Sequence, residues 1–183
     1  MLKNNSQSGK FFLTVKLGQY QTAAVLCDAI EKKGKIISNY AEQIINKISI
    51  SATDDRVDLL EVSGTELGFT ESVPRSEIYK RAFELGFIKC PAEAMALARI
   101  QCSDSKWRIC GMEPIADSAG DLCMLDLHGD GDDLWLGTGF DRSGGLWFPN
   151  DVWVFASPMV QVISSLNHAS QCSISHISPY SVW

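Results

Sequence analysis

The hydrophobic pattern of the chain changes its period between residues 90 and 100, and this change constrains the fold more than any other feature. Before it, apolar residues recur at three- and four-residue spacing, which is typical of helices that bury one face. After it, short alternating runs are separated by turn residues every 8 to 12 positions or so, which is typical of antiparallel strands. The sequence therefore predicts an α+β protein, with N-terminal helices packed on a mainly antiparallel β-meander in the C-terminal half.

The first part of the chain, residues 10–100, is predicted to be mainly helical. Its predicted elements are a strand over 10–17, a helix over 22–33, a helix over 38–48, a strand over 57–62 and a helix over 72–85. Thr22, Ser38 and Ser72 are expected caps, because a hydroxyl just before a helix accepts a hydrogen bond from an amide of its first turn. Gly34 is expected to end the first helix, because glycine takes the left-handed conformation without a steric penalty.

The second part, residues 101–156, is predicted to be the β-meander. A short helix is expected to start at Cys90-Pro91-Ala92-Glu93, and the alternation from Leu97 to Cys102 then predicts a strand. The other predicted strands cover residues 107–114, 122–128, 133–137 and 152–156. The chain is thus expected to form one domain over 10–156, between a disordered leader (1–9) and a serine-rich tail (157–183) with room for one short helix.

Charge and hydropathy limit the partners of this chain. The formal net charge is −6 and the isoelectric point is about 5.0, so the molecule as a whole does not attract the phosphates of nucleic acid. No run reaches the roughly 18 to 20 apolar residues of a membrane-spanning helix, and the N-terminus lacks the apolar core of a secretion signal. We therefore expect a cytoplasmic protein whose partner is a protein or a small molecule.

The cysteines and histidines do not predict a metal or cofactor site. None of the six cysteines is separated from another by only two residues, which is the spacing of zinc knuckles and redox dithiols. His128, His168 and His176 form no ligand motif with them. The sequence thus predicts reduced thiols, no structural metal and no cofactor.

Several short motifs carry a resemblance that runs from about Lys16 to Phe155. The most specific motifs are Glu84-Leu85-Gly86, Cys90-Pro91-Ala92-Glu93, Met112-Glu113-Pro114-Ile115, Asp117-Ser118, Leu134-Trp135-Leu136 and Trp153-Val154-Phe155. On these motifs the chain resembles a family of uncharacterised bacterial proteins. The resemblance implies a shared fold and no assigned reaction or ligand. The pattern of that family does not require His128 or the extension over 157–183.

Cys90 is the leading candidate for catalysis. A thiol at the N-terminus of a helix lies near the positive end of the helix dipole and ionises more readily than a free thiol. Glu93, one turn further along, or His128 is the expected general base of such a site. The competing interpretation is that Cys90 is a core residue, because free cysteine is among the most buried residue types.

Acidic residues between the strands allow two interpretations. Glu113 lies at the end of a predicted strand and Asp117 beside the turn that follows, where carboxylates can bind a ligand or do acid-base chemistry. Asp117-Ser118-Ala119-Gly120 also has the residue order of a turn, which we prefer. Likewise, the acidic run around Asp130-Gly131 lacks the spacing of an EF-hand and favours a hairpin over a calcium site.

Aromatic residues are concentrated in the predicted meander. Alternation in Leu134-Trp135-Leu136 places Trp135 on the face opposite its aliphatic neighbours, and Trp147 follows in the next run. Such a face can stack a ligand or dock a partner, or it can be covered by the N-terminal helices. The sequence therefore favours a non-enzymatic binding or adaptor module with an aromatic sheet face. The alternative is a small cysteine-dependent hydrolase or transferase with Cys90 as nucleophile.

Overall fold

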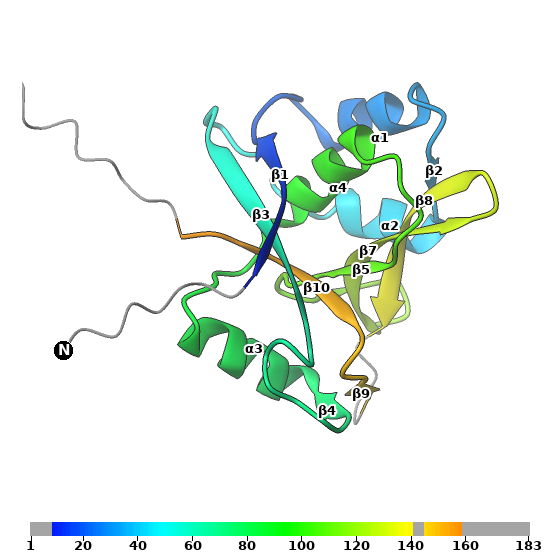
Figure 1. Cartoon of the computed structure of the whole chain (residues 1–183). Helices are drawn as coiled ribbons and strands as arrows, with labels where there is room; N and C mark the ends of the chain where they lie inside the picture. Colours follow the sequence, from blue (N-terminus) through cyan, green and yellow to red (C-terminus); the bar gives the residue numbers. More distant parts are fainter. Residues whose placement is uncertain (1–8, 141–144, 159–183) are drawn as a thin grey trace, which may run out of the picture.

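Helices on both sides of a mixed β-sheet give the chain an α+β architecture (Figure 1). The computed structural model describes residues 9–140 and 145–158. The predicted leader and tail lie outside the described residues, apart from Gly9, Ser157 and Pro158. The predictions for these two segments therefore stay predictions.

The described residues form four helices and ten strands. The helices are α1 (Ala23–Glu31), α2 (Asn39–Ile45), α3 (Arg75–Glu84) and α4 (Ala92–Gln101). The strands are β1 (Lys10–Lys16), β2 (Ile36–Ile37), β3 (Arg56–Ser63), β4 (Val73–Pro74), β5 (Arg108–Cys110), β6 (Ile115–Ala116), β7 (Leu122–Asp130), β8 (Asp133–Phe140), β9 (Leu146–Trp147) and β10 (Val152–Ala156).

The main sheet contains eight of these strands. Their order is β1-β3-β10-β5-β7-β8-β2, with β6 attached to β7. Two neighbouring pairs, β10 with β5 and β2 with β8, are parallel, and the other pairs are antiparallel. The strands β1 and β2 lie at the two ends of this order, while β4 and β9 form a separate two-stranded sheet.

The sheet is packed on both faces. The helices α2 and α4 contact the strands β7 and β8 from one side, and α1 packs beside α4. On the other side lies α3, whose Tyr79 ring meets the rings of Trp153 and Phe155 edge-on at 5.8 and 5.7 Å. Figure 1 shows α3 and the β4–β9 pair separated from the other three helices by the sheet. No helix within the described ranges has the length and apolar character needed to cross a bilayer.

Local signals in the sequence predicted the starts and ends of several elements correctly. The hydroxyl oxygens of Thr22 and Ser38 each accept a hydrogen bond of 3.2 Å from the amide three residues further on. Gly34 has a φ of 69°, as expected of a residue that ends a helix. The prediction of Ser72 as a cap is wrong, because α3 starts only after Pro74. The preceding Val73 and Pro74 are held in an extended conformation by their pairing with β9.

The predicted strand from Leu97 to Cys102 is wrong, and the short helix before it is longer than expected. Leu97 to Gln101 belong to α4, and Cys102 follows the helix in an extended conformation. The helix is buried on most sides, with Ala94 to Arg99 all inside the protein. A helix that is buried all round carries no polar stripe with a period of 3.6 residues, so its sequence gives no helical periodicity.

The meander predicted over residues 101–156 forms only part of the main sheet, which includes strands from the N-terminal half as well. The strands β7 and β8 form the expected hairpin, and Gly131 in its two-residue turn has a φ of 60°. However, β10 does not join the end of that meander; it lies between β3 and β5, and β3 in turn pairs with β1. Three strands from the N-terminal half, β1, β2 and β3, are thus part of the sheet, although all four helices precede β5 in the chain.

The position of β3 between two strands predicts an asymmetric response to truncation. Leu59 on β3 is 0% exposed, whereas Leu146 on β9 is 59% exposed. We expect Leu59→Ala to lower the free energy of unfolding by about 2–5 kcal/mol, because it leaves a cavity in the core. Leu146→Ala is the matched control and is expected to change it by less than about 0.5 kcal/mol. Urea unfolding followed by circular dichroism measures both, and equal effects would contradict the placement of β3.

Candidate functional site

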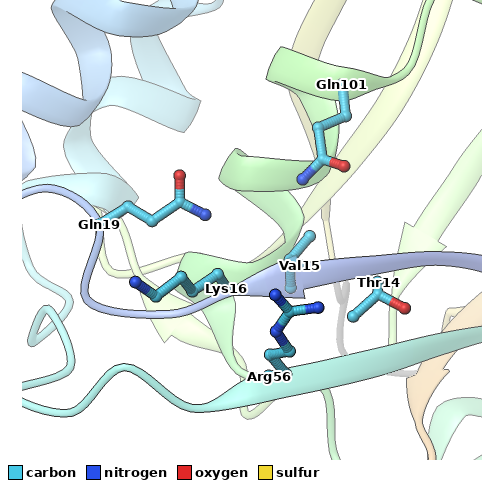
Figure 2. A pocket seen from close by; sticks show the side chains of 6 residues that line it. All are labelled: Thr14, Val15, Lys16, Gln19, Arg56 and Gln101. Atoms are coloured by element: carbon cyan, nitrogen blue, oxygen red, sulfur yellow. The ribbon is translucent and has the colours of Figure 1, made fainter.

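An open cleft of 380 Å³ lies beside β1 (Figure 2). Its lining residues are two cations, two amides, one hydroxyl and one aliphatic side chain: Lys16, Arg56, Gln19, Gln101, Thr14 and Val15. In Figure 2, Gln101 reaches down from the end of α4, Gln19 comes from the loop after β1, and Arg56 rises from β3. Three separate segments of the chain therefore direct polar groups toward one place on β1.

Backbone pairing places two of the lining cations directly opposite each other. Lys16 on β1 is the register partner of Arg56 on β3. The next pair along is hydrogen-bonded, since the Leu17 amide donates to the Asp55 carbonyl at 2.8 Å. Because antiparallel pairs alternate, Lys16 and Arg56 form a non-hydrogen-bonded pair, the type in which the side chains are closest.

A second observation supports this alternation. Two residues before Lys16, Thr14 faces Asp58. The Asp58 carbonyl accepts a hydrogen bond from the Ser157 amide at 2.8 Å, so its backbone polar group is turned away from β1. Thr14 and Asp58 are thus also a non-hydrogen-bonded pair, and the Thr14 hydroxyl reaches the Asp58 carboxylate at 2.5 Å.

The two opposed cations are unequally compensated. Lys16 forms an ion pair with Asp54, with 2.7 Å between Nζ and Oδ2. The guanidinium of Arg56 has no hydrogen-bond or ion-pair partner among the residues that the structure describes. Like charges directly opposite on neighbouring strands destabilise a sheet, so an anion bound beside Arg56 would relieve this repulsion. The arrangement suits recognition of an oxyanion.

Glu93, the predicted general base, supports the wall of this cleft. Its carboxylate is 4% exposed and accepts hydrogen bonds from the amides of Gly18 (2.7 Å) and Ser51 (2.8 Å). Gly18 is the neighbour of Gln19, so the helix α4 fixes the loop that carries one of the lining amides. Both carboxylate oxygens are occupied by these backbone donors, which gives Glu93 a positioning role.

Cys90, the predicted nucleophile, lies inside the protein. It is 2% exposed, its amide donates to the Gly111 carbonyl at 3.0 Å, and its Sγ is 3.5 Å from the Pro91 carbonyl oxygen. Its neighbour Cys110 is completely buried, and this burial together with Cys90 raises the pKa of the Cys110 thiol well above its usual value. The five cysteines in the described part of the chain are free thiols, as expected.

His128, the alternative base, pairs with a carboxylate that the sequence did not single out for this role. Its Nδ1 lies 2.8 Å from Oδ1 of Asp126, and its ring stacks on Trp135 with 6.2 Å between centroids and 5° between planes. A side chain at Gly137 would meet both members of the pair, at 2.5 Å from the His128 ring and 2.6 Å from the Asp126 carboxylate. The described contacts of His128 do not include Cys90 or Glu93.

The two predicted aromatic binding residues occupy different environments. Trp135 is partly exposed beside His128. Trp147 is 9% exposed, and its ring meets that of Trp153 at 4.9 Å in an edge-on arrangement. In this structure Trp147 contributes to the core, and only Trp135 lies at the surface.

The two predicted acidic binding residues are likewise separated. Glu113 is exposed and forms an ion pair with Lys89, and the hydrogen bond from Lys89 lowers the pKa of Glu113. Asp117 is buried, and its Oδ1 accepts hydrogen bonds from the amides of Ala119 (2.8 Å) and Asp121 (3.0 Å). The turn preferred in the sequence analysis is therefore present between β6 and β7.

Sequence reasoning did not identify the cleft. Lys16 and Arg56 are 40 positions apart in the chain, and nothing in the sequence gives the register that places them opposite each other. The only local signal was the prediction of two strands, one over 10–17 and one over 57–62. Within the described ranges, no group of three or more His, Cys, Asp and Glu side chains is arranged to hold a metal ion.

Comparisons with known proteins do not indicate a function for the cleft beside β1. No protein-family model, no curated protein and no solved structure matches the chain. The resemblance to a bacterial family therefore stays a prediction from the sequence motifs. The function has to be argued from the arrangement of side chains.

The role of Glu93 predicts a loss of stability when its charge is removed. In Glu93→Gln one carboxylate oxygen is replaced by an NH₂ donor that faces a backbone donor, so we expect the free energy of unfolding to fall by about 1–3 kcal/mol. The control is Glu84→Gln, which removes an exposed carboxylate that pairs with Arg81 at 3.1 Å. This exposed pair is expected to contribute less than about 1 kcal/mol. An equal effect of both changes in urea unfolding would contradict a positioning role for Glu93.

The pair of His128 and Asp126 predicts a pH-dependent contribution to stability. The hydrogen bond that His128 donates to Asp126 raises the pKa of His128, while burial and the nearby Arg99 act in the opposite direction and Asp130 adds to the increase. Because the folded-state pKa is raised, the stabilisation is complete below the unfolded-state pKa of about 6.5 and is lost as the pH rises through the folded-state pKa.

NMR titration of the His128 ring tests this effect. We expect the measured pKa to be above the usual value in the native sequence and to fall in Asp126→Asn. Asp130→Asn, which removes only a more distant charge, should lower it less. An unchanged pKa in Asp126→Asn would contradict the assignment.

Proposed function

We propose that the chain is a non-enzymatic binding module whose ligand presents a carboxylate or another oxyanion to the cleft beside β1. The observation that carries this proposal is the uncompensated guanidinium of Arg56 opposite Lys16. An arginine presents five N–H donors in a planar fork, and its pairing with an oxyanion is charge-assisted. The amides of Gln19 and Gln101 add further donors at the same place.

The overall charge supports a compact anionic ligand. A long polyanion would be repelled by a chain whose net charge is −6, whereas a single anionic group meets only the local cations. The proposed partner is therefore a small molecule or a protein segment, and not nucleic acid. Free, mostly buried thiols support a cytoplasmic location for this module.

The geometry gives less support to the cysteine-dependent enzyme. A nucleophilic thiol must be reachable and must have a base within hydrogen-bond distance. Cys90 is buried, and the described hydrogen bonds of Glu93 and His128 go to other groups. The aromatic sheet face predicted from the sequence stays a proposal for Trp135, which could extend a binding surface beside His128.

Titration of the ¹⁵N-labelled protein with citrate tests the proposed function. We expect saturable chemical-shift changes at the amides of residues 14–19, at Arg56 and at Gln101. Arg56→Gln removes the charge but keeps a polar side chain, so it should weaken binding by roughly tenfold, about 1.4 kcal/mol.

Arg81→Gln is the matched control. Arg81 lies on α3 and already donates to the Leu67 carbonyl and to Glu84. It should leave citrate binding unchanged. Shift changes that do not saturate, or equal binding to the native protein and Arg56→Gln, would overturn the proposal.

A further inference from the structure

We infer that β1 accepts an extended acidic peptide segment as an additional strand, so that the cleft is one end of a peptide-binding edge. This inference rests on the proposed function, because it assigns the anionic group to a protein partner. It adds a requirement that a free anion does not have: the partner's backbone must pair with the backbone of β1.

The backbone of β1 has unused hydrogen-bonding groups at its outer edge. Among the described strands, β1 is the last in the order of the sheet and pairs only with β3. Thr14 and Lys16 belong to non-hydrogen-bonded pairs, so their amides and carbonyls point away from β3. Within the described ranges no backbone or side-chain group bonds to them. An edge of this kind is a template for another strand.

The length of the regular edge limits the size of the segment. The register with β3 shifts between Phe11 and Leu13, so the strand is regular only from Leu13 to Lys16. At the other end, the chain turns at Gly18, whose amide is held by Glu93. A partner strand of about four paired residues therefore fits between the irregularity and the turn.

Side chains on both faces of the edge indicate which residues fit. A partner residue opposite Lys16 projects to the same face as Lys16 and Arg56, where a carboxylate would meet two positive charges. The residue opposite Val15 projects to the other face, below Gln101, where Val15 itself is buried. The edge thus favours a segment with an acidic residue opposite Lys16 and an apolar residue opposite Val15.

The charges along β1 argue against a second copy of the chain as the occupant. Antiparallel pairing of two β1 strands about Val15, within the regular residues, would make Lys16 of one copy the diagonal neighbour of Lys16 of the other, on the face that also carries both Arg56 side chains. Long side chains of like charge at such positions repel each other. Lysines at an edge strand discourage self-association, and the same lysines attract an acidic partner.

The first experiment compares three fluorescently labelled peptides by anisotropy. The test peptide is the capped heptapeptide Thr-Glu-Val-Glu-Val-Glu-Thr. One control replaces its glutamates by lysines, and the other carries N-methyl groups on its glutamate and valine amides, which keeps the charge but removes the donors needed for pairing with β1. We expect the test peptide to bind at least roughly tenfold more tightly than either control.

The second experiment changes the edge of the protein. Thr14→Pro removes an amide that points away from β3, so the pairing with β3 is retained. Thr14→Val removes the hydroxyl but keeps this amide and is the reference. We expect the test peptide to bind Thr14→Pro roughly tenfold more weakly than Thr14→Val. If circular dichroism shows that Thr14→Pro does not fold, the comparison between the three peptides still tests whether the peptide backbone pairs with β1.

The outcomes separate this inference from the proposed function. Saturable citrate binding together with equal affinity for the test peptide and its N-methylated control would overturn strand addition and leave anion binding intact. Absence of binding for both citrate and the peptide would overturn both. A dimer in sedimentation that is present in Thr14→Val and lost in Thr14→Pro would identify a second copy as the occupant and overturn the peptide assignment.

Discussion

The pairing of β3 with β1 on one side and β10 on the other is the constraint on which the described structure depends. A strand inside a sheet must alternate its backbone hydrogen bonds between two neighbours, because each buried amide and carbonyl needs a partner. In β3 this alternation turns the Asp58 carbonyl toward Ser157 and leaves Thr14 without a backbone bond to β3. The same alternation buries Leu59 and places Arg56 opposite Lys16. One hydrogen-bonding pattern thus produces part of the core, the charge pair and the open edge.

The arginines of this chain differ in their burial and in their hydrogen-bond partners. Arg108 is buried beside Glu61 and Asp104, and its hydrogen bond lowers the pKa of Asp104 to about 2. Arg99 is fully buried and donates to backbone carbonyls, including that of Cys102. Arg108 is paired with carboxylates inside the protein, where an unpaired charge would be strongly destabilising, and Arg99 is held by carbonyl oxygens. Arg56 differs because it is exposed at a cleft, where its donors are available to a ligand.

Glu93 and Cys90 show how a catalytic pattern can arise from structural requirements. Both residues lie at the start of α4, where a nucleophile and a base would gain from the helix dipole. In the structure both residues have structural roles. Glu93 accepts hydrogen bonds from the amides of two loops, and Cys90 packs in the core. A carboxylate at the start of a buried helix can satisfy backbone donors of neighbouring segments, and in this chain that requirement is sufficient to explain its presence.

What the sequence determined by itself is the set of features that depend on neighbouring residues. The caps Thr22 and Ser38, the turn at Asp117 and the hairpin at Gly131 are all specified within a few positions, because their hydrogen bonds and φ angles are local. The helix α4 was only partly predicted, since burial on most sides removes the periodicity that marks a helix. The order of the strands and the cleft were decided by the tertiary structure alone. Lys16 meets Arg56 only because β1 pairs with β3 in one register, and a register between distant segments is set by the packing of the whole sheet.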